Sequence, residues 1–321
     1  SDALTNYERA LELRKKGNVP SEIGETLHNL GEASLKDGDY GKSLDYHLKA
    51  LELFRSSGDK SGAAIQSYSI GTIFEYQGRY GAALKSKEEA LKAYRDLQDR
   101  SFWMGEILSG YGHSLAQVGR YDEAQKNLNE AMDLAKELKN QTLIAQTLNF
   151  QGDVFYYQGD LKRASDLFEQ AVRAGAASDV EKDTALLSKY NAAKCAIAEK
   201  SSGIGISSLK GLIQRADAEG LKNVATEARV TLAESLLNVR RVGEAQRALD
   251  EVRTTSEKLG LQVSQTKGEY LLGRALELQG KVEDAVPHYA AAKRLLEGIV
   301  KESGSDGLLK RRDLEEIAGK S

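Results

Sequence analysis

The sequence predicts an all-α fold, a solenoid of about seven stacked helix pairs with capping helices at its ends. Good helix formers dominate the composition, and only two of the 321 residues are proline. A small residue also recurs every 40 or 41 positions, a spacing typical of repeats that each contribute one structural unit. This reference position of each repeat holds Gly31, Gly71, Gly112, Gly152, Ala193, Ala233 and Gly273 in turn.

Further positions recur at fixed distances from the reference position. Glycine follows seven residues later in five repeats, where it can end the first helix in a left-handed conformation. This position holds Gly38, Gly78, Gly119, Gly159 and Gly280, and Lys200 and Arg240 take it in the other two repeats. Alanine recurs twelve and nineteen residues after the reference position in most repeats, which lets the second helix pack closely. Because a mid-helix glycine costs about 1 kcal/mol relative to alanine, we expect each reference glycine to lie at a close helix–helix contact.

The elements follow from this register. Residues 1–20 are predicted to form a second helix whose partner is missing, because "YERALEL" from Tyr7 matches "HLKALEL" from His47. This segment is interpreted either as part of a truncated repeat in a fragment of a longer protein or as a natural cap, since an array needs its end covered. The seven repeats are predicted at residues 21–60, 61–100, 101–140, 141–180, 181–220, 221–260 and 261–300.

Residues 301–321 are predicted to form a C-terminal capping helix that covers the last repeat. Ser305 and Asp306 are good N-cap residues. The apolar stripe of this helix consists of Leu308, Leu309, Leu314 and Ile317.

The fifth repeat departs most from the pattern, in the stretch "AEKSSGIGISSLKGL". Gly203 and Gly205 give it a faint likeness to a phosphate-binding loop, but no Lys-Ser/Thr pair follows at the required spacing. We therefore expect a loosened turn between helices near residues 201–208, which could act as a flexible point in the array.

The recurring pattern resembles the tetratricopeptide repeat (TPR), with its mid-helix glycine, its Gly-x-Tyr turn and two alanines in the second helix. The resemblance covers residues 21 to about 300. The long period is similar to that of the mitotic-spindle adaptors, kinesin light chains and many bacterial regulatory proteins. The resemblance implies a right-handed superhelix whose first helices line a concave, partner-binding face.

Two binding modes known in tetratricopeptide repeat proteins are not expected for this chain, because the residues they require are missing. Spindle adaptors carry an inward asparagine after the mid-helix glycine, whereas this sequence has Glu32, Thr72, His113 and Asp153 there. Chaperone-binding members hold a carboxylate with inward Lys, Arg and Asn, whereas the matching first-repeat residues here are His28 and Glu32. The carboxylate of Glu32 would repel such a ligand.

Composition excludes several classes of partner. Lys and Arg total 45 against 48 Asp and Glu, so the net charge of −3 gives no reason to expect nucleic acid. No stretch approaches the roughly 18 apolar residues that a membrane span requires. The single cysteine, Cys195, rules out an internal disulfide and favours a reducing compartment, so we expect a cytoplasmic protein. The chain does not start with Met, which leaves open whether a leader was removed.

The sequence predicts neither an enzyme nor a metal or cofactor site. The four histidines are scattered, and none forms a His-x-x-x-His or His-Glu-x-x-His motif. No Gly-x-Ser-x-Gly elbow occurs, and Cys195 is interpreted as a buried structural residue.

The first helices carry the candidate binding residues. Residues six and three before, one after, and four or five after the reference position share one face of each first helix. The candidates on this concave face are Glu32, Tyr68, Thr72, Glu75, Tyr76, Glu106, His113, Asn149, Asp153, Tyr156, Tyr157 and Tyr190. In the first four repeats this face carries five acidic residues against one lysine, Lys36. We therefore expect a peptide with basic residues and apolar anchors; the alternative is an ordinary solvated face with some tyrosines in packing.

These observations predict a non-catalytic protein–protein interaction scaffold that binds a peptide or partner segment in its concave groove, as part of a larger regulatory protein. The alternative is a sensor domain that binds a signal peptide or small ligand and controls an effector domain outside this chain. A weaker alternative is an enzyme subunit without its catalytic domain. The uncovered first helix also leaves room for self-association.

Overall fold

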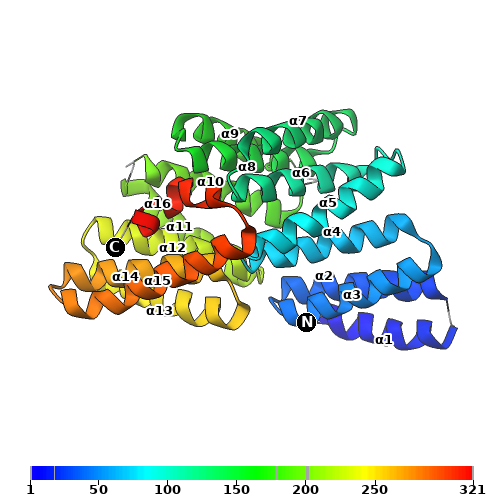
Figure 1. The fold of residues 1–321 in the computed structure, drawn as a ribbon, viewed down its shortest axis with the longest axis horizontal. Coiled ribbons are helices and arrows are strands. Elements are labelled where there is room, and N and C mark those ends of the chain that lie inside the picture. The colour runs from blue at the N-terminus through cyan, green and yellow to red at the C-terminus, as the bar shows by residue number, and fades with distance from the viewer. Residues whose placement is uncertain (1, 18, 178–179, 200–201, 320–321) are drawn as a thin grey trace.

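The computed structural model describes residues 2–17, 19–177, 180–199 and 202–319. Sixteen α-helices and one 3₁₀ helix lie within these ranges, which contain no strand. Successive antiparallel helices stack into a curved array that turns back on itself (Figure 1). The predicted all-α solenoid is therefore confirmed. None of the helices in the described ranges is both long enough and apolar enough to span a membrane.

The helices are arranged as seven consecutive pairs with additional elements at both ends. Helix α1 (Asp2–Gly17) packs on the first pair. The pairs are α2–α3 (Pro20–Lys36, Tyr40–Ser57), α4–α5 (Lys60–Tyr76, Tyr80–Asp96), α6–α7 (Phe102–Gln117, Tyr121–Glu137), α8–α9 (Gln141–Gln158, Leu161–Ala174), α10–α11 (Lys182–Ala198, Ser202–Ala218), α12–α13 (Lys222–Asn238, Val242–Leu259) and α14–α15 (Gln262–Leu278, Val282–Ser303). They are followed by the 3₁₀ helix η1 (Asp306–Lys310) and by α16 (Arg312–Gly319).

Each reference glycine leaves space for a side chain on the second helix of its own pair. A Cβ built on Gly152 would lie 2.4 Å from the Phe168 ring, and a Cβ on Gly273 would lie 2.7 Å from the Tyr289 ring. In all five repeats with a reference glycine, the intruding residue stands sixteen positions later; these residues are His47, Lys87, Leu128, Phe168 and Tyr289. The expected close contacts are therefore present.

The turn within each pair requires a left-handed residue. The glycines at this position have φ values between 73° and 82°. Arg240 adopts the same conformation with φ 59°, although a side chain disfavours it. The sixth pair therefore keeps the turn of the others where the glycine signal is missing, while Lys200 lies outside the described residues.

The expected loosened turn in the fifth repeat is wrong where the structure describes it. Helix α11 begins at Ser202, so residues 202–208 are helical rather than part of a turn. Residue 201 lies outside the described ranges. Glycine is tolerated in a helix where neighbouring contacts offset its backbone entropy, and a Cβ on Gly205 would lie 2.5 Å from Ile197.

The array closes on itself because its last pair returns to the second. The carboxylate of Glu302 in α15 accepts hydrogen bonds from the backbone N–H groups of Gly81 and Ala82, at 2.9 and 3.1 Å, in the first turn of α5. An anion is favourable at this end of a helix because the N–H groups there lack helical partners. A second contact joins distant pairs: the ammonium of Lys222, at the start of α12, donates a hydrogen bond to the backbone carbonyl of Asp37, just after α2.

The C-terminal segment does more than cover the last repeat, which corrects the prediction for residues 301–321. The regular helix α15 continues to Ser303, and the segment after it forms η1 and α16 instead of one helix. Leu308, Leu314 and Ile317 are buried in a cluster that includes Tyr80 and Val118 of the second and third pairs. The segment therefore joins the end of the array to its N-terminal half.

Arg311 anchors this connection. Its guanidinium is buried and donates to both carboxylate oxygens of Asp313, at 3.0 and 2.9 Å, and to the Gln117 backbone and side-chain oxygens at 3.3 Å. Its charged plane lies 3.9 Å from the centre of the Tyr157 ring. A planar guanidinium can bind a carboxylate with two parallel hydrogen bonds while its flat face stacks on an aromatic ring, a geometry that an ammonium does not offer.

We predict opposite effects of alanine at two glycines. Gly152→Ala should destabilise the protein by about 1–3 kcal/mol, because its methyl group would overlap Phe168. Gly211→Ala should stabilise it by about 0.5–1 kcal/mol, because that helical glycine has open space around it. Thermal and denaturant melts of the full chain measure both effects, and destabilisation by Gly211→Ala would contradict the packing explanation.

We also predict that Arg311→Leu releases the C-terminal segment. Within the described ranges, the change leaves Asp313 with Lys267 as its one cationic partner. The loss of stability should therefore be about 3 kcal/mol, the lower end of the cost of breaking a buried pair. Hydrogen exchange should show weaker protection of residues 308–317. Arg294→Leu, an exposed site on α15, is the control. Unchanged protection in Arg311→Leu would show that the segment is held without this guanidinium.

Candidate ligand chamber

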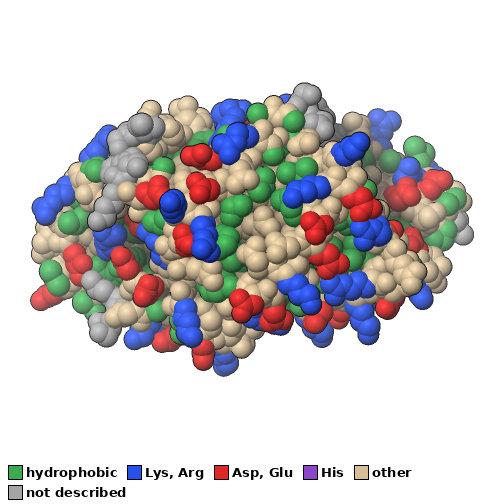
Figure 2. Space-filling view, turned by 90° about the horizontal axis from the view of Figure 1, so that it is seen from above, with side chains coloured by type: hydrophobic (Ala, Val, Ile, Leu, Met, Phe, Trp, Pro, Cys, Tyr) green, Lys and Arg blue, Asp and Glu red, His purple; other side chains and the backbone are tan. Residues whose placement is uncertain are grey.

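A cavity of about 640 Å³ lies inside the superhelix, between the first helices of the pairs and α16. Eleven acidic residues line it against seven lysines and arginines, so its wall is more acidic than the chain as a whole. In contrast, acidic and basic side chains are interspersed on the outer face in Figure 2. The charge imbalance is therefore concentrated at the cavity, which we call the chamber.

The chamber brings together most of the residues predicted from the sequence. Those that line it are Glu32, Tyr68, Thr72, Glu75, Tyr76, Glu106, His113, Asp153, Tyr156, Tyr157 and Tyr190. Asn149 does not: it is fully buried between α8 and α10, where its amide donates to the Ser188 hydroxyl at 2.8 Å. Asn149 therefore belongs to the contact between neighbouring repeats.

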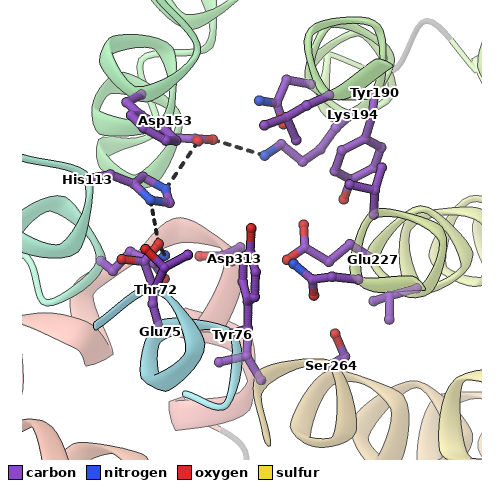
Figure 3. Close-up of a pocket in the computed structure, with 18 of the residues that line it drawn as sticks. Thr72, Glu75, Tyr76, His113, Asp153, Tyr190, Lys194, Glu227, Ser264 and Asp313 are labelled. Carbon is purple, nitrogen blue, oxygen red and sulfur yellow. Dashed lines mark hydrogen bonds and ion pairs between the residues drawn. The ribbon is translucent and has the colours of Figure 1, made fainter. Parts of the chain in front are cut away.

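Glu75 lies at the centre of a buried ion network on one wall. Its carboxylate accepts hydrogen bonds from Lys87 Nζ at 2.5 Å, from Gln117 Nε2 at 3.2 Å and from the Ser114 hydroxyl. It also contacts His113 Nδ1 at 2.8 Å, a contact that is marked in Figure 3. Burial acts to raise the pKa of Glu75, but Lys87 and His113 outweigh it and hold that pKa well below its usual range. Glu75 is therefore an anion that its own neighbours neutralise.

The network continues through His113 to the next repeats. His113 Nε2 lies 3.5 Å from Asp153, and Lys194 donates to Asp153 at 3.1 Å. Burial acts to lower the pKa of His113, but Glu75 and Asp153 raise it to about 9. The Lys194 ammonium also lies 4.6 Å from the centre of the Tyr156 ring. The tyrosine faces of the chamber therefore already accept a cation.

These pairs correct the expectation that Glu75 and Asp153 offer free negative charge to a ligand. The acidic groups without an ion pair among the described residues lie elsewhere on the wall. They include Glu106 of α6 and, on α12, Glu227 and Glu234; Glu227 faces the chamber in Figure 3. Burial raises the pKa of all three, that of Glu106 to about 7. A cation placed in the chamber would stabilise their charged forms.

Glu106 is oriented although no cationic partner for it occurs in the described part of the chain. Gln146 Nε2 donates to its carboxylate at 3.1 Å, and the Tyr68 hydroxyl donates at 3.4 Å. These neutral donors fix the position of the carboxyl group without supplying a positive charge. The arrangement suits a carboxylate that awaits a basic group more than one used to hold the fold.

Two groups of residues line the chamber that were not among the candidates predicted from the sequence. Lys87 belongs to a second helix, but it stands sixteen residues after its reference glycine, where other repeats have Leu128 or Phe168. A lysine at a position that other repeats fill with an apolar core residue is the feature of the sequence that could have identified it. Arg311 and Arg312 enter the wall from the C-terminal segment, and two adjacent arginines beside an apolar stripe gave only a weak indication.

The family model described as the MalT-like TPR region matches residues 2–295. Human tetratricopeptide repeat protein 29 is 25% identical over 146 residues, which make up 46% of this chain and 30% of that protein. The chain therefore spans less than a third of the length of this relative.

Solved structures show the same fold at low sequence identity. A Rap protein complexed with competence and sporulation factor is 16% identical, with a TM-score of 0.67 over 94% of this chain and 86% of that one. The Rap conjugation gene regulator of plasmid pLS20, in complex with the Phr* peptide, is 15% identical, with a TM-score of 0.66 over 89% and 77%. Together with the family match, the repeats place this chain in the MalT-like tetratricopeptide repeat family.

Proposed function

We propose that this chain is a non-catalytic binding protein whose chamber holds a short peptide or a partner segment with at least one basic side chain. The observation that carries the proposal is the set of oriented or half-buried carboxylates, above all Glu106 and Glu227, that form no ion pair among the described residues. A buried carboxylate is stabilised by a charge-assisted hydrogen bond, which arginine and lysine side chains supply.

The size and lining of the chamber support a peptide. Its volume of about 640 Å³ falls within the ~300–1,000 Å³ of pockets that enclose small ligands. Tyrosines from α4, α8 and α10 supply apolar faces with hydroxyl edges, which suits a peptide that alternates apolar and polar groups. The two Rap structures were solved with a peptide or factor bound, so this fold accommodates such a ligand.

The chain also contains an internal example of the proposed recognition. Arg311 lies 3.9 Å from the Tyr157 ring centre, and Arg312 donates to the Tyr156 hydroxyl at 3.3 Å. Arginines therefore bind to tyrosines of this wall in the folded chain itself. A basic ligand would contact tyrosines of the wall in the same manner. Its charge would pair with the neighbouring carboxylates that these arginines do not reach.

The polar groups of the chamber favour binding over catalysis. Both ring nitrogens of His113 face carboxylates, so the imidazole has no free position to serve as a general base. Cys195 is buried, its thiol donates to the Leu161 carbonyl at 3.3 Å, and burial raises its pKa to about 11. A thiol of this kind is a poor nucleophile at neutral pH.

A sensor function is the second candidate, and the C-terminal segment favours it. Residues 311–313 line the chamber, and Arg311 and Asp313 also connect the N-terminal half of the array, through Gln117, with the last pair, through Lys267. A ligand in the chamber would therefore contact the segment that closes the superhelix, so binding could change how firmly the ends are joined. Such a link would suit a domain that reports ligand binding to an effector outside this chain.

We predict that the carboxylates of α12 select basic peptides. The full chain should bind Arg- or Lys-containing members of a synthetic hexapeptide library better than their Gln-substituted counterparts. Glu227→Gln combined with Glu234→Gln should weaken binding of the best basic peptide by at least about tenfold, the equivalent of one charge-assisted hydrogen bond. Fluorescence polarisation of labelled peptides measures the change.

The matched control combines Glu283→Gln with Asp284→Asn, two exposed acids in the first turn of α15 that are not part of the chamber wall. This control should bind as the unmodified chain does. Equal loss in both double variants would assign the effect to overall charge, and equal binding of basic and Gln-substituted peptides would refute charge recognition.

We predict that Glu106→Gln has opposite effects on stability and binding. Because burial raises the pKa of Glu106 to about 7 from an ordinary 4.5, the folded chain holds more protons than the unfolded chain between these values. Its stability therefore falls as pH rises through this window. Since the carboxyl is half-buried, removing the ionisable group should add about 1–3 kcal/mol at pH 8.

The same variant should bind a basic peptide more weakly at pH 8. Binding by the unmodified chain should decline by several-fold between pH 8 and pH 6, as Glu106 gains a proton, whereas the variant should lack this part of the decline. His113 stays charged over this range because its pKa is about 9. Parallel pH profiles for the two proteins would exclude Glu106 from the recognition of the ligand.

A further inference from the structure

Two histidines and a glutamate converge at the N-terminal end of the inner face. His28 and Glu32 stand one turn apart on α2, and His47 comes from α3. One possible ligand atom from each residue lies within 4.8 Å of the other two. His47 Nε2 is 3.5 Å from Glu32 Oε1, and the two imidazole ring centres are 5.5 Å apart. The two histidines are scattered in the sequence, and only the pairing of α2 with α3 brings their rings together.

His47 occupies a position where other repeats place packing residues. It stands sixteen residues after Gly31 and fills the space that this glycine leaves, as Leu128 and Phe168 do in later pairs. Its side chain is completely buried, and its Nε2 atom has no hydrogen-bond partner among the residues that the structure describes. An apolar residue would pack there without an unsatisfied polar atom, so simple packing does not explain the histidine.

The surrounding hydrogen bonds leave the lone pair of His47 facing Glu32. His47 Nδ1 contacts Gln66 Oε1 at 2.8 Å, which assigns the proton to Nδ1 and leaves Nε2 as an acceptor in the neutral ring. Burial favours that neutral ring. Glu32 Oε1 accepts a hydrogen bond from the Ser69 hydroxyl at 3.1 Å. Two acceptors therefore face each other across 3.5 Å, an arrangement that a cation between them would stabilise.

We propose that His28, Glu32 and His47 form a binding site for a divalent transition-metal cation of the zinc type. Two imidazoles and one carboxylate are the nitrogen and oxygen ligands that such ions select. Gln66 and Ser69 of α4 hold His47 and Glu32 from behind, and Gln66 Oε1 also lies 3.4 Å from His28 Nδ1. Outer contacts of this kind orient metal ligands in proteins. Glu32 also lines the chamber, so the site borders it.

The only tryptophan of the chain supplies a local readout. The Trp103 ring centre lies 6.1 Å from that of His28. Titrating the full chain with Co²⁺ should quench this fluorescence and saturate at about one ion per chain, and Zn²⁺ should compete. Equilibrium dialysis with Zn²⁺ should give the same stoichiometry. Absence of Zn²⁺ binding, or quenching that Zn²⁺ does not reverse, would overturn the proposal.

Two variants test the ligands. His47→Leu introduces the residue that the third helix pair has at the same position, Leu128, so the variant should fold, and its metal-free form should be at least as stable as the unmodified chain. Glu32→Gln keeps the shape of the side chain. Each should weaken Zn²⁺ binding by more than the roughly 10–100-fold that follows loss of an outer hydrogen bond. Retained binding in either variant would assign the ion to another place.

The matched control is His288→Leu. His288 Nδ1 lies 2.7 Å from Glu269 across the α14–α15 pair, without a second histidine in a metal-binding group among the described residues. This variant should bind Zn²⁺ as the unmodified chain does, and its melting temperature should rise equally with added Zn²⁺, because an ion that binds only the folded state stabilises it. Loss of binding in this control would refute the assignment to α2 and α3.

Discussion

The close approach of the two helices within each pair is the constraint on which the rest of the structure depends. A side chain on the second helix fills the space left by a missing Cβ on the first, as Phe168 does at Gly152. This contact fixes the geometry of each pair, and stacking similar pairs curves the array until Glu302 reaches the start of α5. The chamber is the space that the curvature encloses, so its existence follows from packing at the glycines.

The fold could be predicted because backbone requirements repeat in the sequence. Glycines at the left-handed turn positions mark the pairs, and Arg240 shows that stacking preserves the turn even where the residue type does not favour it. The fifth repeat misled because its glycines were interpreted as turn formers. Neighbouring contacts such as that of Ile197 with Gly205 make helix acceptable there, and a single sequence does not reveal such tertiary contacts.

For the candidate site, the sequence could predict which residues share the inner face of the helices, but not which of them pair with one another. Helical spacing shows that Glu75 and Asp153 point inward, but it does not show that Lys87 and Lys194 neutralise them. Lys87 approaches from a second helix, and Arg311 is separated from Gln117 by 194 residues. Partners that meet across the chamber depend on the closure of the whole superhelix, which no local pattern encodes. The carboxylates left without partners could therefore be identified only after the pairs were known.

The residue sixteen positions after the reference glycine connects packing to function. In the third and fourth pairs it is Leu128 or Phe168, which pack as apolar core, whereas the first two pairs place His47 and Lys87 at the same buried position. Apolar residues of similar volume usually stabilise a core at least as well as buried polar or charged ones. The polar choice is therefore not explained by stability. In both pairs the buried group faces a carboxylate of the inner wall, Glu32 or Glu75, so the same packing position that holds a pair together also sets the charge of the chamber.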